Sequence, residues 1–193
     1  MPRNICIIHG HPDPTPGHFT GALADAYETA AREAGHAVSR IELGAMDVPV
    51  LRKAADFATE PPPLIKEAQE KILAAEHMVV VFPMWLGGMP AHARAFFEQI
   101  SRAGFALQES EHGWPKGMLA GRSARVVVTM GMPSIAYRML FGAHGVRGFE
   151  RSVLAISGFK PIHETLFGMI EGTDADGRAK MIAKMARFGK LGS

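Results

Sequence analysis

Three segments of this sequence combine polar side chains, glycines and prolines in the way that ligand-binding loops do. The first, residues 9–20, links an apolar run to an amphipathic one and reads His-Gly-His-Pro-Asp-Pro-Thr-Pro-Gly-His-Phe-Thr. A helix that begins after such a loop offers unpaired backbone N–H groups, which suit a phosphate, and Thr15, His18 and Thr20 would add side-chain donors. The spacing fits neither G-x-G-x-x-G nor the Walker A pattern. A proline-stiffened connector is the alternative.

The second segment, residues 83–90, reads Pro-Met-Trp-Leu-Gly-Gly-Met-Pro. Its two glycines would let a planar ligand approach the backbone closely, and Met84, Trp85 and Leu86 would provide apolar flanks. The alternative is a hydrophobic turn whose tryptophan packs internally.

The third segment begins with Thr129-Met-Gly-Met and continues to Tyr137 and then His144-Gly145. A tyrosine and a histidine beyond the end of a strand can supply hydrogen bonds and protons to a bound substrate. Taken singly, each of these residues is more often structural. The three segments support one another only if the fold brings them together.

The hydrophobic pattern predicts elements that would do so. Short apolar runs predict five buried strands, at residues 4–8, 37–43, 77–82, 124–129 and 161–167. Amphipathic stretches between them predict helices at residues 19–34, 64–76, 90–100, 148–157 and 175–188, whereas residues 44–63 are expected to be irregular. Strands that alternate with helices indicate a doubly wound α/β domain. Ligands bind such sheets beyond the carboxyl ends of the strands, where all three segments would lie.

Composition excludes several other classes of protein. Cys6 is the single cysteine, so there is no intrachain disulfide, and a reducing cytoplasm is the expected location. A net charge of +2 is too small to indicate nucleic-acid binding, and no apolar run reaches the ~20 residues of a membrane span. The nine histidines occur without H-E-x-x-H or a carboxylate cluster, so no metal site is expected. The absence of G-x-S-x-G argues against an α/β hydrolase.

Several motifs in order along the chain give the sequence a family likeness. They are His11-Pro-Asp-Pro-Thr15 with Phe19, Val80 to Ala91 followed by Phe97-Glu98, Thr129-x-Gly131 with Tyr137, His144-Gly145, and Ser157-Gly-Phe159. Together they resemble the flavodoxin-like NAD(P)H:quinone reductases, the DT-diaphorase group and its shorter bacterial relatives. The likeness covers nearly the whole chain.

The resemblance implies one flavodoxin-like, flavin-binding domain over residues 1–193, with strand order 2-1-3-4-5 and helices on both faces. The flavin, FAD or FMN, would lie across the strand ends. Its phosphate end would meet the first loop, at His11, Thr15, His18, Phe19 and Thr20. Its isoalloxazine would lie along Pro83, Met84, Trp85, Leu86 and Gly87, with Thr129, Met130, Gly131, Met132 and Tyr137 beside it.

The resemblance also implies a homodimer with the site at the interface, and a Tyr137/His144 pair that lies over the flavin and assists hydride transfer. Three departures from the family pattern stand in this sequence: Thr-Met-Gly-Met where the family has Thr-Thr-Gly-Gly, Thr20 where it commonly has Asn in a first loop one residue shorter, and one extra residue between Tyr137 and His144. The leading hypothesis is an oxidoreductase that passes hydride from NADH or NADPH through the flavin to a quinone or similar planar acceptor, by a ping-pong scheme. The alternatives are a flavodoxin-like FMN electron carrier and a regulatory subunit of a potassium-efflux transporter.

Overall fold

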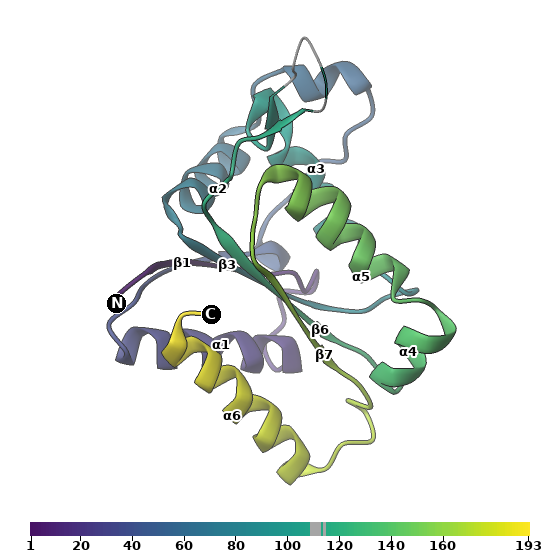
Figure 1. The fold of residues 1–193 in the computed structure, drawn as a ribbon. Helices are drawn as coiled ribbons and strands as arrows, with labels where there is room; N and C mark the ends of the chain where they lie inside the picture. Colours follow the sequence, from purple (N-terminus) through teal and green to yellow (C-terminus); the bar gives the residue numbers. More distant parts are fainter. Residues whose placement is uncertain (109–112, 114) are drawn as a thin grey trace.

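The computed structural model describes residues 1–108, 113 and 115–193, and its centre is a sheet of five parallel strands (Figure 1). The strands lie in the order β2-β1-β3-β6-β7, which confirms the predicted order 2-1-3-4-5. Their bounds are β1 (Asn4–His9), β2 (Ala37–Glu42), β3 (His77–Pro83), β6 (Ser123–Thr129) and β7 (Ile162–Phe167). Because β1, β3 and β6 are covered on both faces, their sequences are almost continuously apolar.

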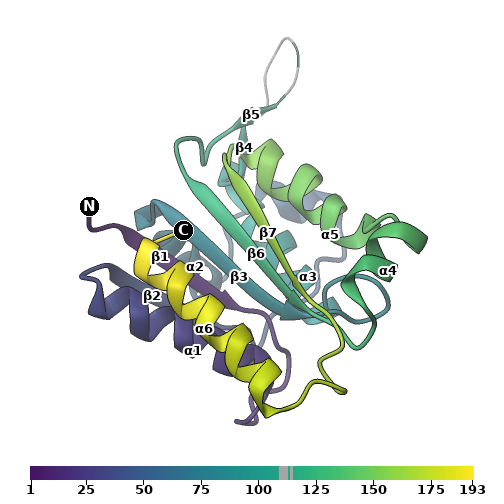
Figure 2. The ribbon, with the colours of Figure 1, turned by 60° about the horizontal axis from the view of Figure 1, so that its bottom comes forward.

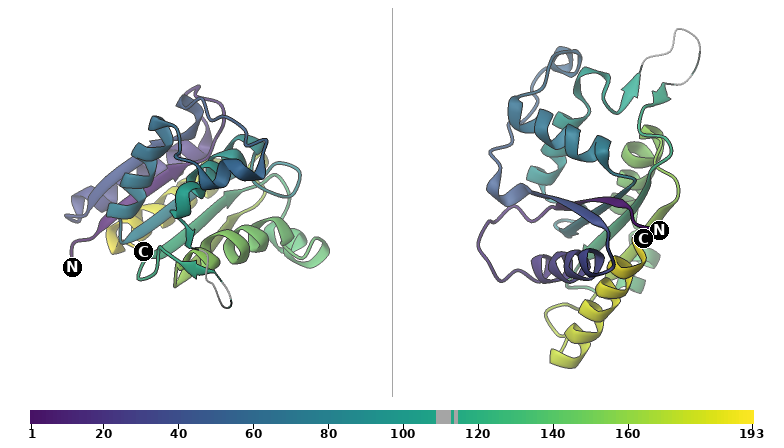
Figure 3. Two further views of the ribbon diagram at one scale, coloured as in Figure 1. Left: turned by 90° about the horizontal axis from the view of Figure 1, so that it is seen from above. Right: turned by 90° about the vertical axis from the view of Figure 1, so that its left-hand side faces the viewer.

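Helices cover both faces of the sheet, as Figures 2 and 3 show from several sides. One face carries α1 (Phe19–Glu33) and α6 (Ala175–Leu191), which pack together over the side chains of Ile5 and Ile7. The other face carries α2 (Pro63–Ala74), α3 (Ala91–Ile100) and α5 (His144–Phe149), which continues into the π-helical segment η4 (Glu150–Ala155). Alternate residues of each strand therefore supply two separate cores.

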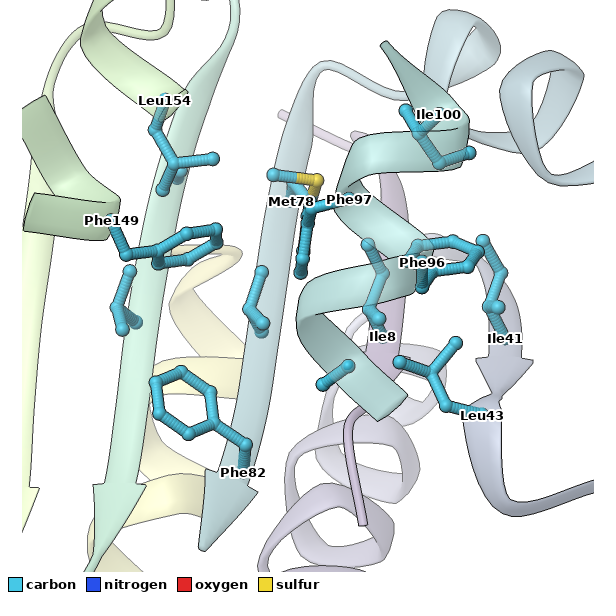
Figure 4. Close-up of a cluster of buried hydrophobic side chains, with 14 of the residues drawn as sticks. Ile8, Ile41, Leu43, Met78, Phe82, Phe96, Phe97, Ile100, Phe149 and Leu154 are labelled. Atoms are coloured by element: carbon cyan, nitrogen blue, oxygen red, sulfur yellow. The ribbon is translucent and has the colours of Figure 1, made fainter. Parts of the chain in front are cut away.

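The larger core lies between the sheet and α3 and α5 (Figure 4). Its centre is aromatic: the rings of Phe97 and Phe149 are 4.7 Å apart, and Phe82 meets Phe149 edge to face at 6.2 Å. Such contacts add to the burial of large side chains. They fix α5, and so the loop before it, against the end of β3 and against α3.

Three parts of the chain differ from the expectation. Residues 134–140, expected to be loop, form the helix α4 (Ser134–Leu140), and α5 begins at His144 rather than at residue 148. Short 3-10 turns occupy parts of the irregular stretches: η1 (Leu43–Ala45), η2 (Ala54–Ala58) and η3 (Arg102–Gly104). A small antiparallel pair, β4 (Leu107–Gln108) and β5 (Lys116–Gly117), was not predicted, because two-residue strands carry no periodic signal.

Candidate functional site

The carboxyl ends of β1, β3 and β6 bring the three predicted loops to one edge of the sheet. Backbone hydrogen bonds join them, from Gly10 N–H to the carbonyl of Val81 (2.7 Å) and from Met84 N–H to that of Thr129 (2.8 Å). The ring of His11 also meets Trp85 edge to face, with centroids 6.1 Å apart. The convergence expected from the strand order is therefore present.

The first loop is held in shape by Asp13. One carboxylate oxygen accepts from Thr15 N–H at 2.8 Å and the other lies 3.0 Å from His18 Nε2. Hydrogen bonds from Thr15, with His18 adding a smaller effect, lower the pKa of Asp13 to about 2. The rings of His11 and His18 stack at 3.6 Å, and burial, followed by the charge of His18, lowers the pKa of His11.

This loop arches over a cavity of about 360 Å³ beside the beginning of α1. His18 is the N-cap residue of α1 and its side chain makes no capping hydrogen bond. The first N–H groups of the helix therefore have no side-chain acceptor, which is the condition that suits an anion. Of the residues expected to meet a phosphate, His11, Thr15 and His18 line this cavity, and His9 lines it as well. Their contact with a flavin stays a prediction.

Thr20 lies deeper than expected, because its hydroxyl is held by a buried histidine. Thr20 is 2% exposed, and its Oγ1 lies 3.0 Å from His9 Nε2. The other ring nitrogen of His9 lies 2.6 Å from a carboxylate oxygen of Glu42. Burial favours a raised pKa for Glu42, but the hydrogen bond and charge of His9, with Arg40, outweigh it and lower that pKa. Glu42 is thus an ionised acceptor.

The sequence reading missed His9 and Glu42 as members of this loop's support. Each occupies the last position of its strand, and the parallel register of β1 and β2 places them opposite one another. Arg40, two residues before Glu42, also contacts Asp25 and Glu28 of α1. The two residues could have been found from the parallel pairing of β1 with β2, which puts the Glu42 carboxylate beside the buried imidazole of His9.

The second loop is a tight, strained turn with an apolar tip. Trp85 and Gly88 exchange both backbone hydrogen bonds (2.9 and 3.0 Å), and the two residues between them have positive φ, 47° at Leu86 and 79° at Gly87. This is the pattern of a type I′ turn, in which a leucine is unusual. The Leu86 side chain is fully exposed and Trp85 is half exposed. The alternative of a tryptophan that packs internally is therefore not what the structure has.

At the edge of the sheet, the third loop exposes backbone groups more than side chains. Met130 is 4% exposed, so its thioether belongs to the core and only its backbone reaches the edge, whereas Gly131 and Met132 are exposed. Among the described residues, no hydrogen bond uses the N–H group of Gly131 or Met132. These are two free donors next to the Trp85–Gly88 turn.

Tyr137 and His144 lie in different settings. Tyr137, on α4, is 1% exposed; its hydroxyl donates to the Gly87 carbonyl at 2.8 Å and accepts from Val146 N–H at 3.3 Å. Burial raises the pKa of this phenol. His144 is the exposed first residue of α5. Direct contact of either residue with a flavin or an acceptor stays a prediction.

Comparisons with known proteins agree with this arrangement. A family profile described as "Flavodoxin-like fold" matches residues 3–188. FMN-dependent NADH:quinone oxidoreductase 1 of Jannaschia sp. (strain CCS1) is 34% identical over 92 residues, 48% of this chain and 46% of that protein. NAD(P)H dehydrogenase (quinone) 1 of Rattus norvegicus is 25% identical over 207 residues, 93% of this chain and 74% of that protein.

The crystal structure of Smu.1420 from Streptococcus mutans UA159 superposes with a TM-score of 0.83 at 27% identity, over 97% of this chain and 98% of that one. The match to the Jannaschia protein spans about half of that relative's length. In the part of the chain that the structure describes, no helix has the length and apolar character to cross a bilayer. The strand order and the profile match over residues 3–188 show that the chain belongs to the family described by the flavodoxin-like fold.

Proposed function

We propose that this protein binds a flavin across the ends of β1, β3 and β6 and oxidises NADH or NADPH with it, passing hydride to a quinone or similar planar acceptor. The observation that carries this proposal is the meeting of three unlike surfaces at one edge: an uncapped helix N-terminus, an exposed apolar turn and two free backbone donors. The helix N-terminus suits a phosphate, the apolar turn suits a flat ring, and the two backbone donors suit the polar edge of that ring.

The residues present fit such a cofactor. Nothing lies within 4 Å of the position that a Cβ would take at Gly87 or Gly88, so the face of the turn is open to a planar group. His11, Thr15 and His18 line the cavity beside the beginning of α1 and would hold the phosphate end. Phe19, the first residue of α1, would contribute its backbone N–H, because its ring packs against the smaller core. Thr20, whose hydroxyl is already bonded to His9, supports that end through its backbone and through His9.

The chemistry that a bound flavin supplies is the transfer of hydride from a reduced nicotinamide to the acceptor. This chain's residues hold and polarise the reacting groups. The N–H groups of Gly131 and Met132 could donate hydrogen bonds to negative charge at the polar edge of a bound flavin ring. This would be preorganised electrostatic stabilisation. His144, exposed beside the turn, can donate a proton to the acceptor oxygen. Donor and acceptor would bind in turn at this one edge of the sheet, which is a ping-pong scheme.

A homodimer would complete the site. Exposed apolar side chains gather on α4 and its flanks: Met132, Ile135, Met139, Leu140 and Phe141. The tip of the Trp85–Gly88 turn is exposed and apolar as well. Surfaces of this kind are typical of protein interfaces. A second copy over this surface would cover α4 and supply a further wall for the acceptor.

Flavin binding tests the proposal. The purified protein is incubated with FMN or FAD, passed over a desalting column and examined by visible absorbance, and the released flavin is identified by chromatography. We expect stoichiometric uptake of one of the two. A protein that emerges colourless from both incubations would overturn the proposal. A flavin that binds but is not reduced by NADH or NADPH would favour the electron-carrier alternative.

A further inference from the structure

The two tyrosines of this chain have contrasting hydroxyl groups. Both side chains are fully enclosed, at 0% exposure for Tyr27 and 1% for Tyr137. Within residues 1–108, 113 and 115–193, the Tyr27 hydroxyl has no hydrogen-bond partner. The Tyr137 hydroxyl has two, and both belong to the backbone: Gly87 in the second loop and Val146 in α5. A phenol carries one proton, and that of Tyr137 is already donated to the Gly87 carbonyl.

The acceptor of that proton belongs to a turn that needs support. Leu86 is held in the left-handed region at φ 47°, where an L-residue costs about 1–2 kcal/mol. Its side chain is fully exposed, so no burial of that side chain offsets this cost. Strain of this kind persists only where the surroundings fix the backbone. Around this turn they are the Trp85–Gly88 hydrogen bonds, the Tyr137 hydroxyl and the close packing of Gly145 on the Gly87 carbonyl.

We propose that Tyr137 is a positioning residue, which clamps the strained Trp85–Gly88 turn from beneath and so fixes the surface on which the flavin ring lies, and that it does not relay a proton to the acceptor. Relaying the phenolic proton would break the bond to Gly87 and release the turn. Proton delivery then falls to His144, the exposed member of the pair. This inference rests on the proposed function.

The test uses Trp85 as a reporter within the turn. Trp114→Phe removes the only other tryptophan, and in that background the variants Tyr137→Phe and Tyr27→Phe each delete one buried hydroxyl. We expect Tyr137→Phe to increase acrylamide quenching of Trp85 and to weaken binding of FMN and riboflavin alike by about tenfold, the effect of losing one buried hydrogen bond. Tyr27→Phe should change neither quantity. The pH profile of kcat should keep its shape in both variants.

Leu86→Asn supplies a rescue, because Asn-Gly favours a type I′ turn by itself. Adding it to Tyr137→Phe should restore both the Trp85 quenching and the flavin affinity to those of Leu86→Asn alone. If Tyr137→Phe fails to fold, the double variant should fold, and a double variant that stays unfolded contradicts the clamp.

Two outcomes separate this inference from the function on which it rests. Unchanged Trp85 quenching and flavin affinity in Tyr137→Phe, with a lower kcat and an altered pH profile, would assign the residue to proton relay and overturn the clamp while leaving the function intact. Failure of the wild-type protein to bind FMN or riboflavin would overturn both.

Discussion

Gly145 offers a sharp test of the geometry at the sheet edge. A Cβ added there would lie 2.1 Å from the Gly87 carbonyl oxygen and 2.9 Å from Gly88 Cα, and both atoms are backbone. Three residues later in the same helix, Gly148 has no atom within 4 Å of the corresponding position. Gly145→Ala and Gly148→Ala therefore make the same chemical change in one helix, against opposite surroundings.

The two expected free energies differ in sign. Replacing glycine by alanine within a helix stabilises by about 0.5–1 kcal/mol where space allows, so Gly148→Ala should raise the free energy of unfolding by that amount. At Gly145 the same gain is opposed by overpacking, which costs about 1–3 kcal/mol when the neighbours are rigid. Gly145→Ala should thus lose up to about 2.5 kcal/mol, and the two variants should differ by the overpacking cost, about 1–3 kcal/mol.

Thermal unfolding followed by circular dichroism measures this difference. For a chain of this length, each kcal/mol shifts Tm by about 2–4 °C, so the two Tm values should lie roughly 2–12 °C apart. Flavin affinity should fall in Gly145→Ala alone, because the added methyl group displaces the Trp85–Gly88 turn. Equal Tm values, or a more stable Gly145→Ala, would show that α5 does not lie against this turn and would refute the reasoning.

Three further substitutions test other parts of the structure. Burial, with the charge of Glu164 adding to it, raises the pKa of Glu150 from 4.5 to about 7. The folded protein therefore favours the protonated carboxyl, and the free energy of unfolding falls as pH rises from 4.5 to about 7. Glu150→Gln should remove that loss and stabilise above pH 7 by about 1 kcal/mol, allowing for partial exposure, as chemical denaturation at several pH values would reveal. Phe149→Ala should cost about 3–5 kcal/mol, because its ring fills the core between Phe82 and Phe97, and a urea midpoint close to that of the wild type would contradict this packing. The pKa of Glu42 is lowered in the folded protein, so the stabilisation by its carboxylate is present above the pKa of the unfolded chain and is lost as pH falls through the folded-state pKa. The difference in free energy of unfolding between wild type and Glu42→Gln should therefore shrink on acidification. A difference that stays constant in acid-unfolding curves would show that the ionised carboxylate is not stabilised by His9 and Arg40.

The sequence predicted the parts of the fold that follow from hydrophobic periodicity. Runs such as His77–Phe82 identify a buried strand, and the spacing of Leu23 and Tyr27 identifies the inner face of α1. The helix α4 escaped prediction because its apolar residues Ile135, Met139 and Leu140 are exposed, so they do not mark an inner face. Exposed apolar patches of this kind are typical of interaction surfaces.

The sequence predicted where the three loops lie but not how individual side chains in them are oriented. The alternation of strands and helices placed the three loops at one edge, because parallel strands end together. It did not predict that Thr20 bonds to His9, or that the Tyr137 hydroxyl bonds to Gly87. Those contacts depend on the register of β1 with β2 and on the packing of α4 and α5, which involve residues far apart in the chain.

The central claim, that the sheet edge holds a flavin which takes hydride from a nicotinamide and gives it to a quinone, is tested most directly by the two half-reactions. The flavin-loaded protein is mixed anaerobically with NADH or NADPH in a stopped-flow instrument, and the reduced protein is then mixed with a quinone. We expect rapid loss of the oxidised-flavin absorbance in the first step and its full return in the second, without nicotinamide present. A bound flavin that neither nicotinamide reduces, or that is reduced and not reoxidised by the quinone, would contradict the account.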